Sequence, residues 1–396
     1  MKECDFLVVG GGPSGMTFAA AVGKRAKVVV VEEHETIGQP VQCTGLVAPR
    51  VVDMAGARGT VLNRLRGGYF HFPGDQVVEV RGKGTKAVVV DRAAFDQTCA
   101  ELAEDQGAEI ALGERFIDAD LGDRITAHCL NRKGSCNYAA KLIVGADGYK
   151  SNVAKMAGLE GPKDQVRGVQ MDIRHEEDDQ EMLNVYLGKK VAPGFFAWKV
   201  PCGEMTRVGL CVSRSQDAPL TFFNPLLERL GLRDKERMRV ISGMIPIGPP
   251  PRTFAERTLV IGDAAGQAKP LSGGGLYTGM VAAECAAKTA LESLEGNDFG
   301  AEALSSYEER WKTELGRELD RGFLVRRAFI KLSDRKLEEV GRILSREDVR
   351  QVLSEGDIDF PADLAPRVLK TAPSLLKFAP SFLGALFTRS SARNQK

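Results

Sequence analysis

The sequence lacks several features that would place it in familiar protein classes. Its eight cysteines include no pair separated by two residues, and its four histidines are scattered along the chain. We therefore expect no zinc ribbon, no redox-active cysteine pair and no bound metal. No apolar run approaches the roughly 20 residues that a membrane-spanning helix needs. The formal net charge is only +1, so nucleic-acid binding is not indicated either.

The N-terminus enters a strand-like run directly, without a charged and then apolar leader. Together with the unpaired cysteines, this predicts a cytoplasmic protein with reduced thiols. A chain of 396 residues is long enough for two or three domains.

Glycine is abundant, and the most specific motif is a glycine-rich turn near the N-terminus. The apolar run at residues 6–9 predicts a buried parallel strand, and a helix of small residues follows the turn. The spacing GxGxxG allows a tight turn, close approach of a pyrophosphate and close packing of helix on strand. The phosphates would lie at the helix N-terminus. The residues assigned to this site are Gly10, Gly12, Pro13, Ser14 and Gly15.

A second predicted strand, AKVVVVEE, ends in Glu32 and Glu33, about 20 residues after the turn. A carboxylate at this position can bind ribose hydroxyls. It favours an unphosphorylated ribose, which indicates FAD or NAD rather than NADP.

Two later segments narrow this choice. Residues 142–155 hold a buried strand that ends at Asp147, and residues 258–291 hold another that ends at Gly262 and Asp263. Together they resemble the FAD-binding elements of the p-hydroxybenzoate-hydroxylase-like flavoproteins. The resemblance implies that FAD is the cofactor and that Asp263 holds its ribityl chain. It further assigns to the flavin site Arg92, Asp147, Gly262, the run Gly273, Gly274 and Gly275, and a helix that starts near Leu276.

A further motif lies in PGFFAWKVPCGEMTRVG, residues 193–209. It resembles the YxWxFPxxxxxxVG signature of geranylgeranyl reductases, with Phe196 in place of tyrosine and Val200 in place of phenylalanine. The loop PVQCTGLV, residues 40–47, resembles the cysteine-containing loop of the same family. The chain is therefore identified as a member of the geranylgeranyl reductase family, most similar to the archaeal digeranylgeranylglycerophospholipid reductases.

The expected fold is α/β, with a Rossmann-like FAD-binding domain, an interleaved and mostly antiparallel β substrate domain, and a C-terminal helical region. We assign 1–165 to the first part of the FAD-binding domain, with 65–90 contributing to the substrate domain. We assign 166–252 to the substrate domain, 253–300 to the second part of the FAD-binding domain and 301–396 to the helical region. The pattern of residues 301–344 predicts two amphipathic helices.

The family implies reduction of C=C bonds in prenylated lipids, with hydride from reduced FAD and a proton from an active-site acid. Cys43 is the candidate acid, and the alternative is a small buried thiol that only fills space. Gln42 would hydrogen-bond nearby, and Gly45 would allow close approach to the flavin ring or the substrate. Phe196, Trp198 and Pro201 would line an apolar tunnel for the substrate, and the cations available for a phosphoglycerol headgroup at its mouth are Lys189, Lys190 and Arg207. The electron donor, a ferredoxin or NADPH, is left open.

Two other functions fit parts of the sequence. One is an FAD-dependent aromatic monooxygenase or halogenase, since FAWKVP is close to the halogenase pattern WxWxIP. The other is a prenyl-binding protein without turnover.

The last forty residues alternate Ala-Pro breaks with short apolar turns, which is compatible either with packing on the domain or with peripheral contact at the cytoplasmic face of a membrane.

Overall fold

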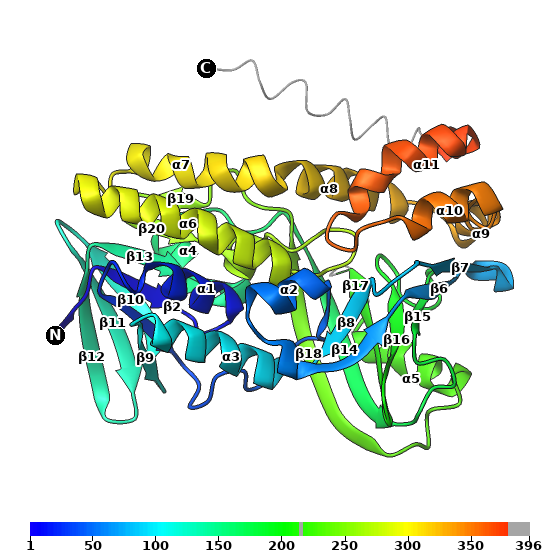
Figure 1. Ribbon diagram of the computed structural model, residues 1–396, viewed down its shortest axis with the longest axis horizontal. Helices are drawn as coiled ribbons and strands as arrows, with labels where there is room; N and C mark the ends of the chain where they lie inside the picture. The colour runs from blue at the N-terminus through cyan, green and yellow to red at the C-terminus, as the bar shows by residue number, and fades with distance from the viewer. Residues whose placement is uncertain (214–216, 379–396) are drawn as a thin grey trace.

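The computed structural model describes residues 1–213 and 217–378 (Figure 1). Its central element is a six-stranded sheet in which every neighbouring pair is parallel except the one at the β19 edge. In spatial order its strands are β19 (Phe254–Ala255), β20 (Thr258–Val260), β13 (Leu142–Gly145), β2 (Phe6–Val9), β3 (Val28–Glu32) and β9 (Glu109–Leu112). The predicted strands at 6–9 and 142–145, and the strand that ends before Gly262, therefore lie side by side, with their carboxyl ends at one edge.

Both faces of this sheet are covered, which explains the unbroken apolar runs. Phe6 and Val8 pack under helices, whereas Leu7 and Val9 pack under a second sheet. The helices of the first face are α1 (Pro13–Val22), α3 (Arg92–Asp105), α6 (Leu276–Gly296) and α7 (Ala301–Trp311), and α4 (Asn152–Met156) lies near β10 and β13. The second sheet is four-stranded, in the order β1 (Lys2–Glu3), β12 (Gly134–Ala140), β11 (Ile125–Asn131) and β10 (Arg115–Leu121). The sequence pattern did not predict this sheet.

A seven-stranded, mostly antiparallel sheet forms the other half of the molecule. Its order is β18 (Arg237–Ile247), β14 (Asp164–Arg174), β17 (Met205–Ser213), β16 (Ala197–Cys202), β15 (Met182–Tyr186), β6 (Gly67–His71) and β7 (Val77–Arg81). Its outer face is covered by α5 (Pro219–Arg229). A small sheet lies between the two halves and consists of β4 (Leu46–Val47), β8 (Ala87–Val90) and β5 (Val61–Leu65). The helix α2 (Pro49–Met54) follows β4 in the chain (Figure 1). Of the segment 65–90, β6 and β7 join the large sheet, whereas β8 does not. The four domain ranges stay a prediction.

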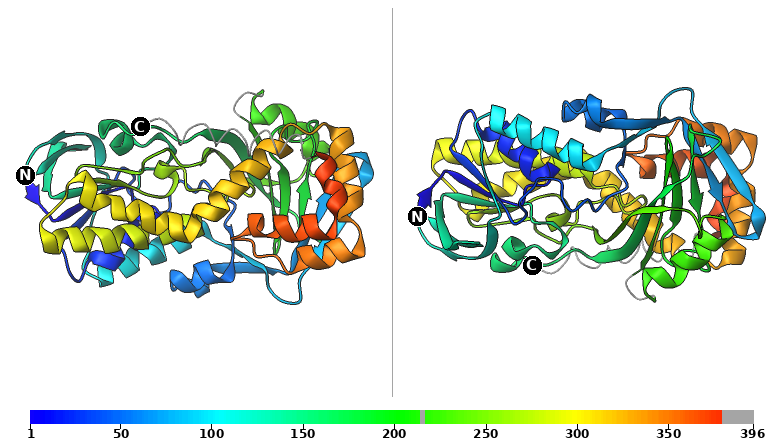
Figure 2. Two further views of the ribbon diagram at one scale, coloured as in Figure 1. Left: turned by 90° about the horizontal axis from the view of Figure 1, so that it is seen from above. Right: turned by 90° about the horizontal axis from the view of Figure 1, so that it is seen from below.

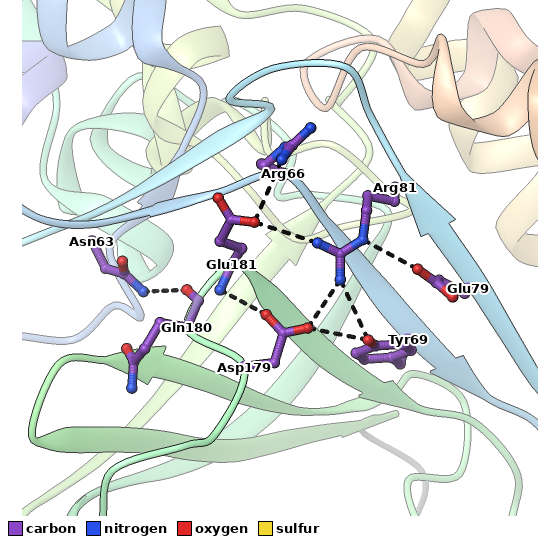
Figure 3. A network of polar contacts seen from close by, with 8 residues as sticks. All are labelled: Asn63, Arg66, Tyr69, Glu79, Arg81, Asp179, Gln180 and Glu181. Carbon is purple, nitrogen blue, oxygen red and sulfur yellow. Dashed lines mark hydrogen bonds and ion pairs between the residues drawn. The ribbon is translucent and has the colours of Figure 1, made fainter.

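The large sheet has one parallel pair, β15 with β6, where two distant chain segments meet. A polar network lies over this pair (Figure 3). Arg81 contacts Glu79, Asp179 and Glu181, and it also reaches the hydroxyl of Tyr69. These groups are partly exposed, so the network contributes little free energy. It does tie the loop at 175–181 to the β6–β7 hairpin.

The C-terminal helices extend from the six-stranded sheet to the seven-stranded one. A π-helical turn, Lys312–Gly316, joins α7 to α8 (Arg317–Phe329), and Figure 2 shows α8 leading across to the second half. There α9 (Asp334–Leu344), α10 (Glu347–Ser354) and α11 (Ala365–Thr371) gather beside β6 and β7. The sequence predicted two helices over 301–344. The structure has one helical run at 301–329, which the π-helical turn divides into α7 and α8, and a second helix, α9. Ser333 accepts a hydrogen bond from the amide of Lys336 and so begins α9 as a separate helix.

Within 1–213 and 217–378, no helix combines the length and apolar character needed to cross a bilayer. Part of the predicted membrane-contacting segment, residues 379–396, lies outside the described residues.

Tyr307 joins α7 to the end of the central sheet, and it carries a prediction. Its buried hydroxyl donates to the carbonyl of Val260 at 2.8 Å and accepts from Nε2 of Gln267 at 3.1 Å. We expect Tyr307→Phe to lower the free energy of unfolding by about 1–3 kcal/mol, because both partners would lose a buried hydrogen bond. Urea denaturation measures this. Tyr149→Phe, at a partly exposed ring, is the control, and an equal loss in both variants would contradict the assignment.

Candidate active site

A cavity of about 1490 Å³ runs along the carboxyl edge of the six-stranded sheet and under the seven-stranded one. It is lined by the glycine-rich turn, by the inner face of β14–β16 and by the C-terminal helices. The residues brought together here come from distant parts of the sequence, as the Rossmann-like fold predicts for the carboxyl ends of parallel strands.

The glycine-rich turn fits a dinucleotide phosphate. Gly10 has a φ of +104°, and a Cβ there would lie 2.4 Å from the carbonyl oxygen of Ala146. A Cβ at Gly15 would lie 2.2 Å from the carbonyl of Gly10. By contrast, a Cβ at Gly12 would meet nothing within 4 Å, so the space above the N-terminus of α1 is open. Free backbone N–H groups border this space, which suits a pyrophosphate.

Glu32 closes the other side of this space. One carboxylate oxygen accepts a hydrogen bond from the amide of Gly11 at 2.7 Å, and the other is 2.5 Å from Nδ1 of His34. A carboxylate has about four acceptor positions, so room remains for a ribose hydroxyl. The neighbouring Glu33 also lines the cavity.

Asp263 lies deeper in the cavity, at the end of β20. Burial raises the pKa of its carboxyl to about 6, and the nearby positive charge of Arg92 acts in the opposite direction. The backbone of Gly275 approaches its carboxylate, since a Cβ there would lie 2.9 Å from Oδ1. The α6 helix then begins at Leu276, as predicted. The arrangement places a hydrogen-bond acceptor, a side-chain-free loop and a helix N-terminus around one space.

Comparison with known proteins agrees with this geometry. The FAD binding domain family matches residues 3–219. Digeranylgeranylglycerophospholipid reductase of Methanothrix thermoacetophila is 31% identical, covering 93% of this chain and 98% of that protein. The chain belongs to this family of FAD-binding reductases. An uncharacterised protein of Methanocaldococcus jannaschii is 32% identical, covering 93% of this chain and 96% of its own.

A solved structure supports the fold. The geranylgeranyl bacteriochlorophyll reductase-like protein of Thermoplasma acidophilum superposes with a TM-score of 0.84 at 24% identity, covering 96% of this chain and 100% of that one. The predicted α/β fold is confirmed. The protein is an FAD-dependent oxidoreductase, and the residues around the open space fit the cofactor.

In this FAD-binding reductase, Cys43 lies on the cavity wall beside Arg92. Its Sγ accepts a hydrogen bond from the amide of Gly45 at 3.3 Å, and it also contacts the Arg92 guanidinium. Arg92 is held by a bidentate ion pair with Asp96, one turn further along α3, with both N–O distances at 3.0 Å. Burial lowers the pKa of Arg92, but the charge of Asp96 and the hydrogen bonds to Asp96 and Cys43 more than offset this, so the pKa is raised overall. Arg92 therefore remains a fixed cation next to the thiol.

Aromatic side chains from β16 and the turn before it form a roof of the cavity that Cys43 also lines. Phe196 stacks on Phe195 with ring centres 4.4 Å apart and meets Trp198 edge-on at 6.0 Å. Trp198 is paired in register with Gly209 on β17, and a Cβ there would lie 2.4 Å from the indole. The indole thus lies flat across β17 because its cross-strand partner has no side chain. This explains why the family motif joins a tryptophan to a glycine eleven residues later.

Most of the predicted site residues line the cavity, and four do not. Those that do are Gly10, Gly12, Pro13, Ser14, Glu32, Glu33, Gln42, Cys43, Arg92, Asp147, Phe196, Trp198, Asp263, Gly273, Gly274, Gly275 and Leu276. Gly15 and Gly262 instead provide close packing, on the backbone of Gly10 and on the Ser14 side chain respectively. Pro201 follows Val200 on β16 and alternates to the other side, where its carbonyl accepts from Asn63.

Gly45 and Arg207 have roles other than those expected. Gly45 has a φ of +74°, and a Cβ there would lie 2.5 Å from the carbonyl of Val90, so its close approach is to β8 rather than to a ligand. Arg207, which we considered as a cation for a lipid headgroup, is only 3% exposed. It donates to the carbonyls of Thr44 and Val90 and so fixes the Cys43 loop.

Sequence reasoning missed one polar pair in the cavity wall of this reductase. Lys269 lies in the loop before the glycine run and forms a buried ion pair with Asp359 at 2.7 Å, while Arg50 contacts the same carboxylate at 3.4 Å. Lys269 also donates to the carbonyl of Ile358. A lysine in a loop and an aspartate ninety residues later give no local signal. The pair joins the flavin loop to the segment between α10 and α11.

Asp263 provides a test through the pH dependence of stability. Its folded pKa of about 6 is above its ordinary value, so ionisation destabilises the folded apoprotein as the pH rises from about 4 to 6. We expect Asp263→Asn to be more stable than wild type at pH 7 by about 1–3 kcal/mol, and the difference to vanish near pH 4. The same change should weaken FAD binding.

Urea denaturation of the apoprotein at the two pH values, with titration of FAD at pH 7, measures both effects. Asp234→Asn, at an exposed position, is the control. If Asp263→Asn matched wild type at pH 7, the carboxyl would not be destabilised by burial.

Proposed function

We propose that this protein reduces isolated C=C bonds in the geranylgeranyl chains of membrane ether lipids or their precursors. The observation that carries the proposal is the apolar arm of the cavity, beyond Cys43. Its walls are long apolar side chains, from the sheet Phe70, Leu183 and Leu187 and from the helices Phe329, Leu344 and Val368.

The chemistry of this arm suits a prenyl chain. Ligand pockets for small molecules commonly measure roughly 300–1,000 Å³, and the whole cavity, which includes the FAD site, exceeds that range. A hydrocarbon chain has no polar atoms to satisfy, so an apolar arm binds it mainly through surface removed from water. The names of the relatives, which are digeranylgeranylglycerophospholipid reductases, support the same substrate class.

The reaction needs hydride at one alkene carbon and a proton at the other. FAD, when bound and reduced, supplies the hydride. Cys43 would supply the proton. Gly45 and Arg92 both donate hydrogen bonds to its sulfur, which leaves the S–H proton to point elsewhere, and the cavity is beside it. The aromatic roof keeps water from the reacting carbons.

Two finer parts of the proposal concern partners. The electrons reach FAD from a ferredoxin or NADPH. The protein works at the cytoplasmic face of a membrane, with its lipid substrate drawn into the apolar arm.

The decisive experiment is anaerobic incubation of the dithionite-reduced holoenzyme with digeranylgeranylglyceryl phospholipid, followed by mass spectrometry. We expect a gain of two mass units for each double bond reduced. No mass gain, combined with oxygen consumption in the presence of NADPH and an aromatic substrate, would instead favour a monooxygenase.

Cys43→Ala tests the acid. We expect the variant to keep FAD and to lose lipid reduction by about 10²-fold or more, because a positioned acid contributes on this order. Product formation under the same anaerobic conditions measures it. Cys285→Ala, at a half-buried thiol on α6, is the matched control. Turnover of Cys43→Ala at the wild-type rate would show that the thiol only fills space.

Leu344→Trp tests the apolar arm. The larger ring at the end of α9 would shorten the arm, so we expect reduction of geranylgeranyl chains to fall while a geranyl substrate is reduced nearly as in wild type. The ratio of kcat/KM for the two chain lengths measures this. Leu121→Trp, on the exposed face of β10, is the control. An unchanged ratio would place the chain elsewhere.

A further inference from the structure

Gln170 is a buried polar side chain in the cavity roof with no role in the mechanism above. It lies in the middle of β14, is 4% exposed and lines the cavity. Its Oε1 accepts hydrogen bonds from Oγ1 of Thr44 at 2.6 Å and from the indole Nε1 of Trp198 at 3.1 Å. The carboxamide therefore joins the loop that carries Cys43 to the aromatic roof.

The orientation of this carboxamide is fixed by its neighbours. An indole N–H can only donate, so the atom that faces Trp198 must be the oxygen. The nitrogen, Nε2, is then left buried, and within 1–213 and 217–378 no hydrogen-bond partner is found for it. A buried donor without a partner is costly, which indicates that a ligand completes it.

Three glycines flank Gln170 on the cavity side of the sheet. Gly209 is its partner on β17, and Gly168 lies two residues before it on β14, paired with Gly243 on β18. Both Gly168 and Gly243 line the cavity. The Trp198 indole covers Gly209 and the Cys211 sulfur lies against Gly168, whereas a Cβ at Gly243 would meet only Oε1 of Gln42, at 3.9 Å. A flat group can therefore approach the backbone at Gly243, on the same wall of the cavity as Gln170.

We propose that Gln170 is a positioning residue with two ends: its oxygen holds the Cys43 loop against the roof, and its N–H pair donates to the isoalloxazine ring of FAD. A prenyl chain offers no hydrogen-bond acceptor, whereas the flavin ring carries carbonyl oxygens and ring nitrogens. The catalytic meaning of the loop contact rests on the proposed role of Cys43. The loop contact itself does not depend on that role, and the contact with the ring depends only on FAD binding.

Two substitutions separate the ends. Gln170→Leu removes both the oxygen and the N–H pair, whereas Gln170→Glu keeps an acceptor for Thr44 and Trp198 and removes the donor. Thr44→Val removes the loop contact from the other side and leaves Gln170 in place. Gln180→Leu, on the outer loop of the same sheet, where the side chain bonds the backbone of Gly203, is the matched control.

The effect of the loop contact is measured as the rate at which Cys43 is alkylated in the holoenzyme without lipid. Peptide mass spectrometry follows the modification. We expect Gln170→Leu and Thr44→Val to raise the alkylation rate about fivefold, as loss of one net hydrogen bond would allow. We expect Gln170→Glu and Gln180→Leu to remain near wild type. Equal rates in all variants would overturn the positioning role.

The proposed hydrogen bond from the Gln170 N–H pair to the ring is tested through the visible absorption spectrum and the midpoint potential of bound FAD. We expect both to shift in Gln170→Leu and neither to shift in Gln180→Leu. An unchanged spectrum and potential in Gln170→Leu would overturn donation to the ring and leave ordered water as the partner. None of these readouts requires lipid reduction, so their failure is distinguishable from failure of the proposed function.

Discussion

The structure depends on backbone contacts that only glycine permits at the carboxyl edge of the central sheet. The carbonyl of Ala146 lies against Gly10, and the carbonyl of Gly10 lies against Gly15. A side chain at either glycine would push α1 away from β2 and β13. Close packing here brings the ends of three strands and the N-termini of α1 and α6 to one place. Every other part of the site, from Glu32 to Asp263, is positioned relative to that point.

The position of the aromatic roof depends on a second constraint, the register of the strands β14, β16 and β17. Trp198 and Gly209 are cross-strand partners, and Gln170 pairs with Gly209 from the other side. An indole can therefore cross one strand and reach the next. A shift of one residue would turn Trp198 to the outer face of the sheet. The motif spacing is thus a consequence of a hairpin whose length sets which residues face each other.

The local patterns of the sequence predicted the parts of the fold that depend on neighbouring residues. The run at 6–9, the turn after it and the helix that begins at Leu276 all follow from local hydrophobicity and glycine spacing. The four-stranded sheet escaped prediction because its strands, such as 115–121, carry mixed polar and apolar residues on a half-exposed surface. Gln170 escaped because QMD in an alternating strand is typical of any amphipathic strand. Its importance arises only when Thr44 and Trp198 fold against it.

The ion pair between Lys269 and Asp359 links two regions with different ligands. Lys269 precedes the glycine loop of the flavin site, and Asp359 lies next to residues that line the apolar arm. Both side chains of the pair are buried, so a bound chain that displaced this segment would also act on the flavin loop. Thermodynamic linkage then requires that the free energy by which the lipid changes FAD affinity equals the free energy by which FAD changes lipid affinity. A substitution at Lys269 or Asp359 that changes this coupling would therefore change the affinity for both ligands.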